Sequence, residues 1–423
     1  MKKYLPFLLI TLLGVLQLRA QEATIVKDSV SLMPGYADQV WYSMESGEQS
    51  RSALDSWDVA FSAKPFSSTI FVNDAKGIEL YTYPNGDTAA WPTVDTAGMS
   101  AWKISYNADT SWTMGAFNRE ANAADPFDLG WGTYSMITHF VTGDSLYILK
   151  YPNGNIQKLW IQQLASGVYS FRHGTLDGMM DMSHVIRKAD FENKNFGYFN
   201  LTSHNAVDPE PVNTDWDLLF TRYIAFLPPS GTPYGVSGVL SNAGVEVAQV
   251  YPVNDVDTYT DYQSATFSAE KNMIGYDWKN FSFMSGWTLQ DSLVYFVKDK
   301  AGEYWKIVFT EFGGSTTGKF YFGKQSFRVT NTDPSQGSSF VRLYPNPTAS
   351  GSNLSLVTDL PQGQADARYQ IISANGQRMA GGNISLSAGF QQTTLRLPEL
   401  AQGMYFLQLQ AGAQQWTERI IIK

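Results

Sequence analysis

Short stretches of alternating apolar and polar residues recur along most of the chain, and no sustained helical period exists outside the apolar run at 5–16. Residues 291–309 hold two such stretches around KAGE at 300–303, whose glycine suits the positive-φ position of a hairpin turn. Residues 144–161 repeat this pattern around a Pro-Asn-Gly bend. Because strand side chains alternate between two faces, the pattern indicates half-buried β-strands. The sequence therefore predicts an all-β fold.

Similar blocks occur twice in the middle of the chain, in one order and with an offset of about 150 residues, as in an internal repeat. The matched blocks are SWDVAF at 56–61 with DWDLLF at 215–220, 72–84 with 241–252, DSLYILK at 144–150 with DSLVYFVK at 291–298, KLWI at 158–161 with KIVF at 306–309, and GVYSF at 167–171 with GKFYF at 318–322. We infer a tandem duplication, with β units at 21–188 and 189–330. Asp58 and Asp217 could act as acid–base groups, but one acid per unit beside an indole favours a structural carboxylate that accepts a backbone N–H.

Residues 1–20 have the pattern of a secretory signal peptide. Lys2 and Lys3 precede the apolar run, and a polar stretch ends at Ala20. A basic start, an apolar core of about 7–15 residues and a small residue at the cut are the expected features, so we predict cleavage between Ala20 and Gln21. The core is shorter than the roughly 20 residues that span a bilayer. With no later apolar segment of that length, we expect export without a transmembrane anchor.

The C-terminal fifth predicts a separate small domain. A polar linker at 331–340 leads into residues 341–423, where alternating stretches predict about seven strands and a small Ig-like β-sandwich. The motif residues of this segment are Tyr344, Pro345, Asn346, Pro347, Gly376, Gly403, Tyr405 and the terminal Lys423. In this series and its spacing the segment resembles the C-terminal sorting domain of type IX secretion substrates. The resemblance implies transport through the periplasm to the outer cell surface, contact with the type IX secretion machinery, removal of the domain by a sortase-like protease, and attachment or release.

The middle region resembles the HmuY family of secreted haem-binding proteins. The resemblance rests on WDVAF at 57–61 and WDLLF at 216–220, on the stretches that begin at Asn73 and Asn242, and on KDKAGEYWKI at 298–307. It implies a tandem pair of HmuY-like β units, each related to an all-β fold that holds haem between two axial histidines or methionines on loops.

One segment at the predicted junction of the two units concentrates side chains that suit haem iron. Residues 173–184 read HGTLDGMMDMSH, and thioether and imidazole groups are ligands for haem iron or copper. The candidate haem ligands are His173, Met179, Met180, Met182 and His184. The alternative is a linker whose methionines pack against both units. The sequence predicts no other metal site.

Composition narrows the function further. The chain has no cysteine, which excludes thiolate metal sites and disulfides, and a net charge of −9 argues against nucleic acid as a partner. Hydrolase and nucleotide-binding signatures are absent, so we expect no catalytic residues and no enzyme activity. Aromatic residues make up 14% of the chain, and four tryptophans fall in one long loop region: Trp91, Trp102, Trp112 and Trp131. The leading expectation is capture of haem, a haemoprotein or a related small ligand; the alternative is an adhesin that binds carbohydrate or protein.

Overall fold

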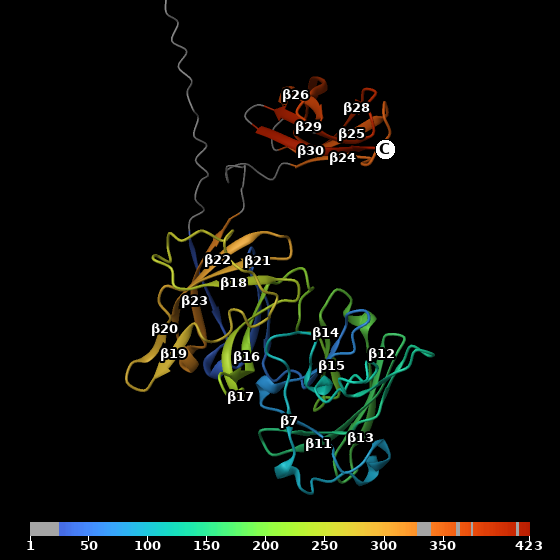
Figure 1. The fold of residues 1–423 in the computed structure, drawn as a ribbon, viewed down its shortest axis with the longest axis vertical. Helices are drawn as coiled ribbons and strands as arrows, with labels where there is room; N and C mark the ends of the chain where they lie inside the picture. Colours follow the sequence, from blue (N-terminus) through green and yellow to red (C-terminus); the bar gives the residue numbers. More distant parts are fainter. Residues whose placement is uncertain (1–24, 328–339, 361–363, 374, 412–413) are drawn as a thin grey trace, which may run out of the picture. The chain divides into compact units, whose positions relative to one another are not determined.

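The computed structural model describes residues 25–327, 340–360, 364–373, 375–411 and 414–423 (Figure 1). The chain divides between Arg328 and Val329 into two compact units. The all-β fold is confirmed, since strands dominate both units. The predicted cleavage site at Ala20 and Gln21 and nearly all of the 331–340 linker lie outside the described residues. Among the described residues, no helix has the length and apolar character needed to cross a membrane.

The first sandwich spans residues 54–207 and consists of two antiparallel sheets. One sheet has the order β15-β14-β4-β5, with β4 (Val59–Ser62), β5 (Ile70–Val72), β14 (Phe196–Asn200) and β15 (Asn205–Val207). The other has the order β13-β12-β11-β10-β6-β7, with β6 (Glu79–Thr82), β7 (Ile104–Ser105), β10 (Tyr147–Lys150), β11 (Ile156–Ala165), β12 (Val168–Gly174) and β13 (Asp181–Arg187). In addition, β9 (Val141–Gly143) pairs with β11, and β8 (Gly132–Tyr134) pairs with β9. Phe61 and Val72 from one sheet and Ile161 and Phe171 from the other belong to one buried core.

The second sandwich is built from residues 26–53 and 208–327. One sheet has the order β17-β16-β2-β3, with β2 (Asp38–Ser43), β3 (Gly47–Ala53), β16 (Leu218–Leu227) and β17 (Thr232–Ser241). The other has the order β1-β23-β22-β21-β18, with β1 (Val26–Ser31), β18 (Glu246–Val250), β21 (Val294–Lys298), β22 (Tyr304–Phe312) and β23 (Lys319–Ser326). A separate hairpin is formed by β19 (Lys279–Ser282) and β20 (Gly286–Leu289).

Among the residues that the structure describes, helical structure is confined to short turns in the loops. They are η1 (Pro34–Tyr36), η2 (Asp74–Lys76), η3 (Thr88–Thr93), η4 (Met99–Ala101), η5 (Ala116–Asn118), η6 (Lys188–Phe191) and α1 (Gly314–Thr317). None is long enough to contribute a core layer, so sheet packing supplies the core of each sandwich.

The N-terminal strands close the second sandwich, although the first sandwich follows them in the chain. β1 pairs with β23 so that Val30 lies opposite Phe320, and β13 pairs with β12 so that Ile186 lies opposite Tyr169. Phe320 and Tyr169 are matched positions of the sequence repeat, so β1 in the second sandwich occupies the place that β13 has in the first. In the same way β2 pairs with β16 as β14 pairs with β4. The first sandwich is therefore continuous, whereas the second is completed by the chain's beginning.

The predicted boundaries at 21–188 and 189–330 do not coincide with these two cores. Val30, Val40 and Met44 are buried in the second core, and Phe199 and Leu201 are buried in the first. Alternation shows which side chains are buried, but a strand of either repeat can complete either sheet with the same alternation. The boundary could therefore not be obtained from the repeat alone.

The two Trp-Asp pairs have the structural role expected for them. Asp217 Oδ2 accepts the backbone N–H of Met44 at 2.8 Å, and Asp58 Oδ2 accepts the backbone N–H of Leu201 at 2.6 Å. Asp217 thus links the start of β16 to Met44, which follows β2. In the same way Asp58 links the start of β4 to Leu201, which follows β14. Asp58 is fully buried and also forms an ion pair with Lys76, at 2.7 Å.

The C-terminal unit has two sheets around one core. One sheet is β24-β25-β28, with β24 (Phe340–Tyr344), β25 (Asn353–Leu360) and β28 (Gly389–Arg396). The other is β27-β26-β29-β30, with β26 (Gln364–Ser373), β27 (Arg378–Leu386), β29 (Gly403–Ala411) and β30 (Gln414–Ile422). Leu354, Leu356, Leu407 and Ile420 are buried between them.

The motif residues of this unit lie mainly around its last strand. Asn346 donates to the carbonyl of Arg419 at 2.6 Å and accepts the N–H of Ile421 at 2.9 Å. The N–H of Lys423 donates to the carbonyl of Thr348, and Tyr405 Oη donates to Ala401. Tyr344 is exposed, and Pro345 and Pro347 flank Asn346. Farther along the chain, Gly376 has a φ of 84° at a turn, and Gly403 is the first residue of β29. The Tyr-Pro-Asn-Pro motif and the chain terminus thus form one structural element.

Candidate functional site

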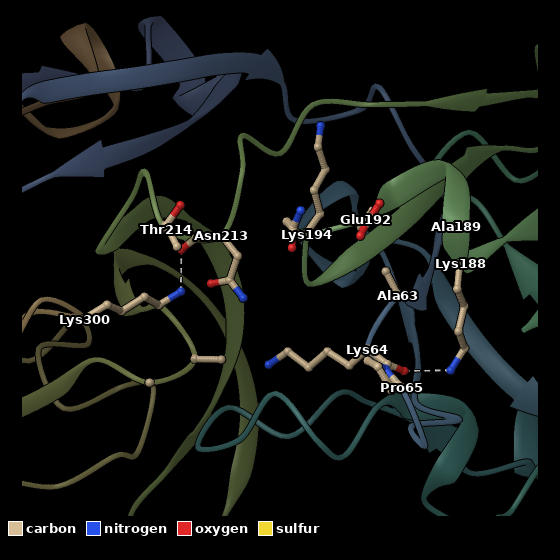
Figure 2. Close-up of a pocket in the computed structure, with 13 residues that line it drawn as sticks. Ala63, Lys64, Pro65, Lys188, Ala189, Glu192, Lys194, Asn213, Thr214 and Lys300 are labelled. Atoms are coloured by element: carbon tan, nitrogen blue, oxygen red, sulfur yellow. Dashed lines mark hydrogen bonds between the residues drawn. The ribbon is translucent and has the colours of Figure 1, made fainter. Parts of the chain in front are cut away.

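A cleft lies where loops of the first sandwich face loops of the second. Its volume is about 870 Å³, and it is lined by Ala63, Lys64, Pro65, Lys188, Ala189, Glu192, Asn193, Lys194, Asn213, Thr214, Ala243, Gly244 and Lys300. The residues at 63–65 and 188–194 belong to the first sandwich, and those at 213–214, 243–244 and 300 belong to the second. Figure 2 shows the side chains of Lys64 and Lys300 converging from opposite walls.

The two sandwiches are held together beside this cleft. Trp112 of the first sandwich packs against the cluster that contains Trp41 and Trp216 of the second, and its Nε1–H donates to the carbonyl of Ser241 at 2.8 Å. The N–H of Asn213 donates to the carbonyl of Asn193 at 2.7 Å, and both residues line the cleft. These contacts connect the two sandwiches, so the lysines of the cleft extend from two walls that are packed against each other.

Four half-buried lysines dominate the charge of the cleft, with Glu192 as the one acid in its lining. Lys188 Nζ donates to the carbonyls of Lys64 and Ser67, and Lys300 Nζ donates to the carbonyl of Asn213. Lys194 forms an ion pair with Asp208 at 2.6 Å. Within the described part of the chain, Lys64 Nζ has no hydrogen-bond acceptor of its own.

Burial makes these ammonium groups less stable than exposed ones. It lowers the pKa of Lys188 to about 8 and that of Lys300 to about 8, and in the case of Lys300 the nearby charge of Lys64 adds to the effect. The pKa of Lys64 is also lowered by burial. A ligand with a negative charge would relieve this cost, because an opposite charge within a few ångströms favours the charged form of a lysine.

Two of the predicted haem ligands lie together, outside this cleft. His173 on β12 and His184 on β13 approach each other at 3.0 Å between their Nε2 atoms. A third histidine, His204 in the turn between β14 and β15, places its Nδ1 at 3.3 Å from His173 Nε2. His204 is not among the haem ligands predicted from the sequence. The only signal available was that it is one of four histidines, because its distance from His184 along the chain matches no ligand-spacing motif.

The three imidazoles form a compact cluster beside the first core. Phe171 and Phe199 pack against His184 at ring-centroid distances of 5.5 and 4.8 Å. His173 is fully buried, and His184 and His204 are half-buried. Burial, followed by the two neighbouring imidazoles, lowers the pKa of His173 to about 4. Its ring is therefore neutral at physiological pH.

The predicted methionine ligands do not form a comparable cluster. Residues 173–184 are a β-hairpin within the first sandwich, so the linker interpretation of this segment is wrong. Met179 at the hairpin tip is 89% exposed, Met182 is also exposed and Met180 is half-buried. Met182 lies opposite His173 in the strand pair and hence on the same face of the sheet. The remaining histidine, His139, contacts Tyr134 Oη through its Nδ1 at 2.8 Å.

The tryptophans considered for sugar stacking are largely structural. Trp91 and Trp131 are buried, Trp112 lies at the contact of the two sandwiches, and Trp102 packs edge-on against Tyr81 and Tyr83. Exposed aromatic side chains occur instead on the β19–β20 hairpin, where Phe281, Phe283 and Trp287 form ring contacts.

Comparison with known proteins identifies the C-terminal unit and little else. Apo PinO from Porphyromonas gingivitis is 12% identical, with 72% of this chain and 97% of that chain covered and a TM-score of 0.20. A polysaccharide lyase is 8% identical, with 96% of this chain and 47% of that chain covered and a TM-score of 0.18. The BSP domain of a biofilm-associated protein is 10% identical, with 96% of this chain and 82% of that chain covered and a TM-score of 0.18. Similarity this low supports no conclusion on fold or function. No curated protein sequence matches the chain.

The sorting prediction is confirmed in the C-terminal unit. Residues 342–423 match the family described as the secretion system C-terminal sorting domain. This segment includes the Asn346 contacts and the terminal strand β30. The chain is therefore a substrate of the type IX secretion system, exported to the cell surface or the extracellular space.

Proposed function

We propose that this exported protein is a non-enzymatic binding protein that captures a small anionic ligand, bearing carboxylate or phosphate groups, in the lysine-lined cleft. The observation that carries the proposal is that Lys64 and Lys300 point toward each other across a cleft of about 870 Å³ in a chain whose net charge is −9 (Figure 2). Lys188 and Lys194 also line this cleft. Basic side chains gathered in one cleft of an acidic protein raise the local concentration of anions.

The available hydrogen-bond donors make this chemistry specific. Each ammonium group has three donors, and a charge-assisted bond to a carboxylate or phosphate is stronger than one to a neutral carbonyl. Lys64 is the strongest candidate for the central contact, since its Nζ has no acceptor among the described residues. Haem belongs to this ligand class through its two propionate carboxylates, which agrees with the resemblance of the repeated units to HmuY. The His173 and Met179–Met182 candidates do not line the cleft, so they would not be its axial ligands there.

Replacing Lys64 by methionine is expected to weaken anion binding about 10- to 100-fold, because a hydrogen bond to a charged group contributes about 1.5–3 kcal/mol. The mature protein would be titrated by calorimetry with haemin, inorganic phosphate and a hexuronate oligosaccharide, which separates the possible sources of the anion. Lys103→Met is the matched control, because Lys103 pairs with Glu120 on an exposed loop.

The pH dependence provides a second readout of the same site. Because Lys188 and Lys300 have pKa values of about 8, binding should be strongest below pH 8 and should fall as the pH rises through 8 to 9. An exposed lysine would hold its proton to about pH 10. Equal binding by wild type and Lys64→Met, or no binding of any of the three probes, would contradict the proposal.

A second candidate function, adhesion to a protein surface, is favoured by the β19–β20 hairpin. Phe283 and Met284 at its tip are each 99% exposed, beside the exposed Phe281. Apolar side chains gathered at an exposed tip are a frequent mark of protein interaction sites.

The double substitution Phe283→Ser with Met284→Ser is expected to reduce adhesion of protein-displaying cells to a protein-coated surface, with no change in thermal stability. Neither side chain is buried, so the core is unaffected. Phe66→Ser removes an equally exposed phenylalanine from another loop and should leave adhesion unchanged. If both variants adhere like wild type, the hairpin is not an adhesive surface.

A further inference from the structure

We propose that His173, His184 and His204 form a binding site for one divalent transition-metal ion of the zinc–copper class, separate from the cleft. The three ligand atoms lie within 4.8 Å of one another. They come from two paired strands and a turn of the first sandwich, so the site is contained within one folded core.

The distances within the cluster suit a shared ion. Zinc–nitrogen bonds are about 2.0–2.1 Å, so two imidazole nitrogens on one tetrahedral ion lie about 3.3 Å apart. A pair at right angles on a square-planar ion lies about 2.9 Å apart. His173 Nε2 is 3.0 Å from His184 Nε2 and 3.3 Å from His204 Nδ1. Both separations from His173 thus suit one ion. The separation between the His184 and His204 ligand atoms is within 4.8 Å, so these two rings move toward each other where coordination requires it.

The hydrogen bond on the other side of the His173 ring leaves the lone pair of Nε2 available to the proposed ion. Its Nδ1 lies 3.2 Å from Gln157 Oε1, and an amide oxygen only accepts hydrogen bonds. Nδ1 therefore carries the proton in the neutral ring, which leaves the lone pair on Nε2. A second hydrogen bond that fixes the tautomer in this way accompanies most metal-binding histidines.

The turn that carries His204 is held in place from both sides. Asn200 Oδ1 accepts the N–H groups of Thr202 and Ser203 at 2.9 Å, and Asn200 Nδ2 donates to the carbonyl of Ser56 at 3.0 Å. His204 itself has a φ of 59°, a left-handed conformation that is uncommon for histidine. The turn thus holds His204 beside the other two histidines in a backbone conformation that is unfavourable for a non-glycine residue.

The donor set decides the class of ion. Three neutral imidazoles without a carboxylate suit Zn²⁺, Cu²⁺ or Ni²⁺ and not Mg²⁺ or Ca²⁺, which prefer oxygen ligands. His184 and His204 are half-buried, so an ion can reach the site from solvent. Three protein ligands also leave a coordination position for water or for a further ligand.

The alternative is a cluster of core histidines that bond only to one another. Titration of the metal-free, full-length protein with Zn²⁺ against a chromophoric chelator separates the two. We expect one tightly bound ion per chain, and Co²⁺ in its place should give the visible absorption of a nitrogen-ligated ion. Copper would be titrated in parallel to rank the two ions.

His204→Ala and His184→Gln test the ligands at their half-buried positions, where unfolding is less of a risk than at His173. Each should lower zinc affinity at least about 100-fold, while Gln157→Leu, which removes only the orienting bond, should lower it about 10-fold. His139→Ala, outside the cluster, should have no effect. Circular dichroism and thermal unfolding confirm that each variant is folded. Zinc binding that is absent at micromolar concentration, or equally strong in both ligand variants, would overturn the proposal.

Discussion

Deletion of residues 25–53 is expected to unfold the second sandwich and to leave the first sandwich folded. The deleted segment, which holds β1 to β3, contributes Val30, Leu32, Val40, Tyr42 and Met44 to the second core, and each of these side chains is at most 1% exposed. Full burial of such a side chain contributes about 1.5–3 kcal/mol, so their loss removes about 10 kcal/mol. A domain is stable by only about 5–15 kcal/mol, and the exposed edges of β16 and β23 would add to the damage.

A permuted chain provides the control for this prediction. In the first sandwich, β12 and β13 are joined by residues 175–180, and β1 holds the corresponding place beside β23. A chain that runs from 208 to 327 and continues through a short turn into 26–53 should therefore fold by itself, as should 54–207. Amide exchange and limited proteolysis would report which core is formed. A stable second core in the simple deletion would show that the N-terminal strands are dispensable.

The contrast between strand positions and strand partners explains how much of this fold could be predicted. Short apolar runs mark β21 and β22 clearly, but the expected half-burial is wrong for these two strands. Four consecutive side chains of each are buried, in two separate clusters on the two faces of the sheet. The alternation in β1 is satisfied equally by β12 or β23, because the repeat made these strands similar. Which of these two strands pairs with β1 depends on the path of the chain through the whole first sandwich. No local sequence pattern predicts that path.

The candidate sites were predictable to different degrees for a similar reason. His173 and His184 are on neighbouring strands of one hairpin, so their closeness along the chain signalled closeness in space. His204 joins them through a turn after β14, and the cleft lysines at 64, 188, 194 and 300 come from separate loops. The histidine cluster therefore exists only once the first sandwich is folded, and the cleft exists only once both sandwiches are assembled.

Removal of the last strand, residues 414–423, is expected to abolish export. β30 pairs along the whole of β29 and buries Ile420 and Ile422 in the core of the sorting domain. It also supplies the main-chain groups that Asn346 and Thr348 bond, so the Tyr-Pro-Asn-Pro motif would lose its support. Without β30 this small unit has one face of its core exposed, and the truncated protein should collect in the periplasm. Cell fractionation with antibody detection of the two sandwiches measures the effect.

Two substitutions distinguish loss of the sorting surface from loss of its fold. Asn346→Ala removes both bonds to β30 but no core side chain, so it should reduce export while leaving most of the domain folded. Phe390→Ser changes an exposed side chain of the same domain and should be exported normally. Because the two sandwiches have cores separate from that of the C-terminal unit, protein retained in the periplasm should still bind the ligand of the cleft. If the truncated chain reached the cell surface normally, the sorting signal would lie outside the terminal strand β30.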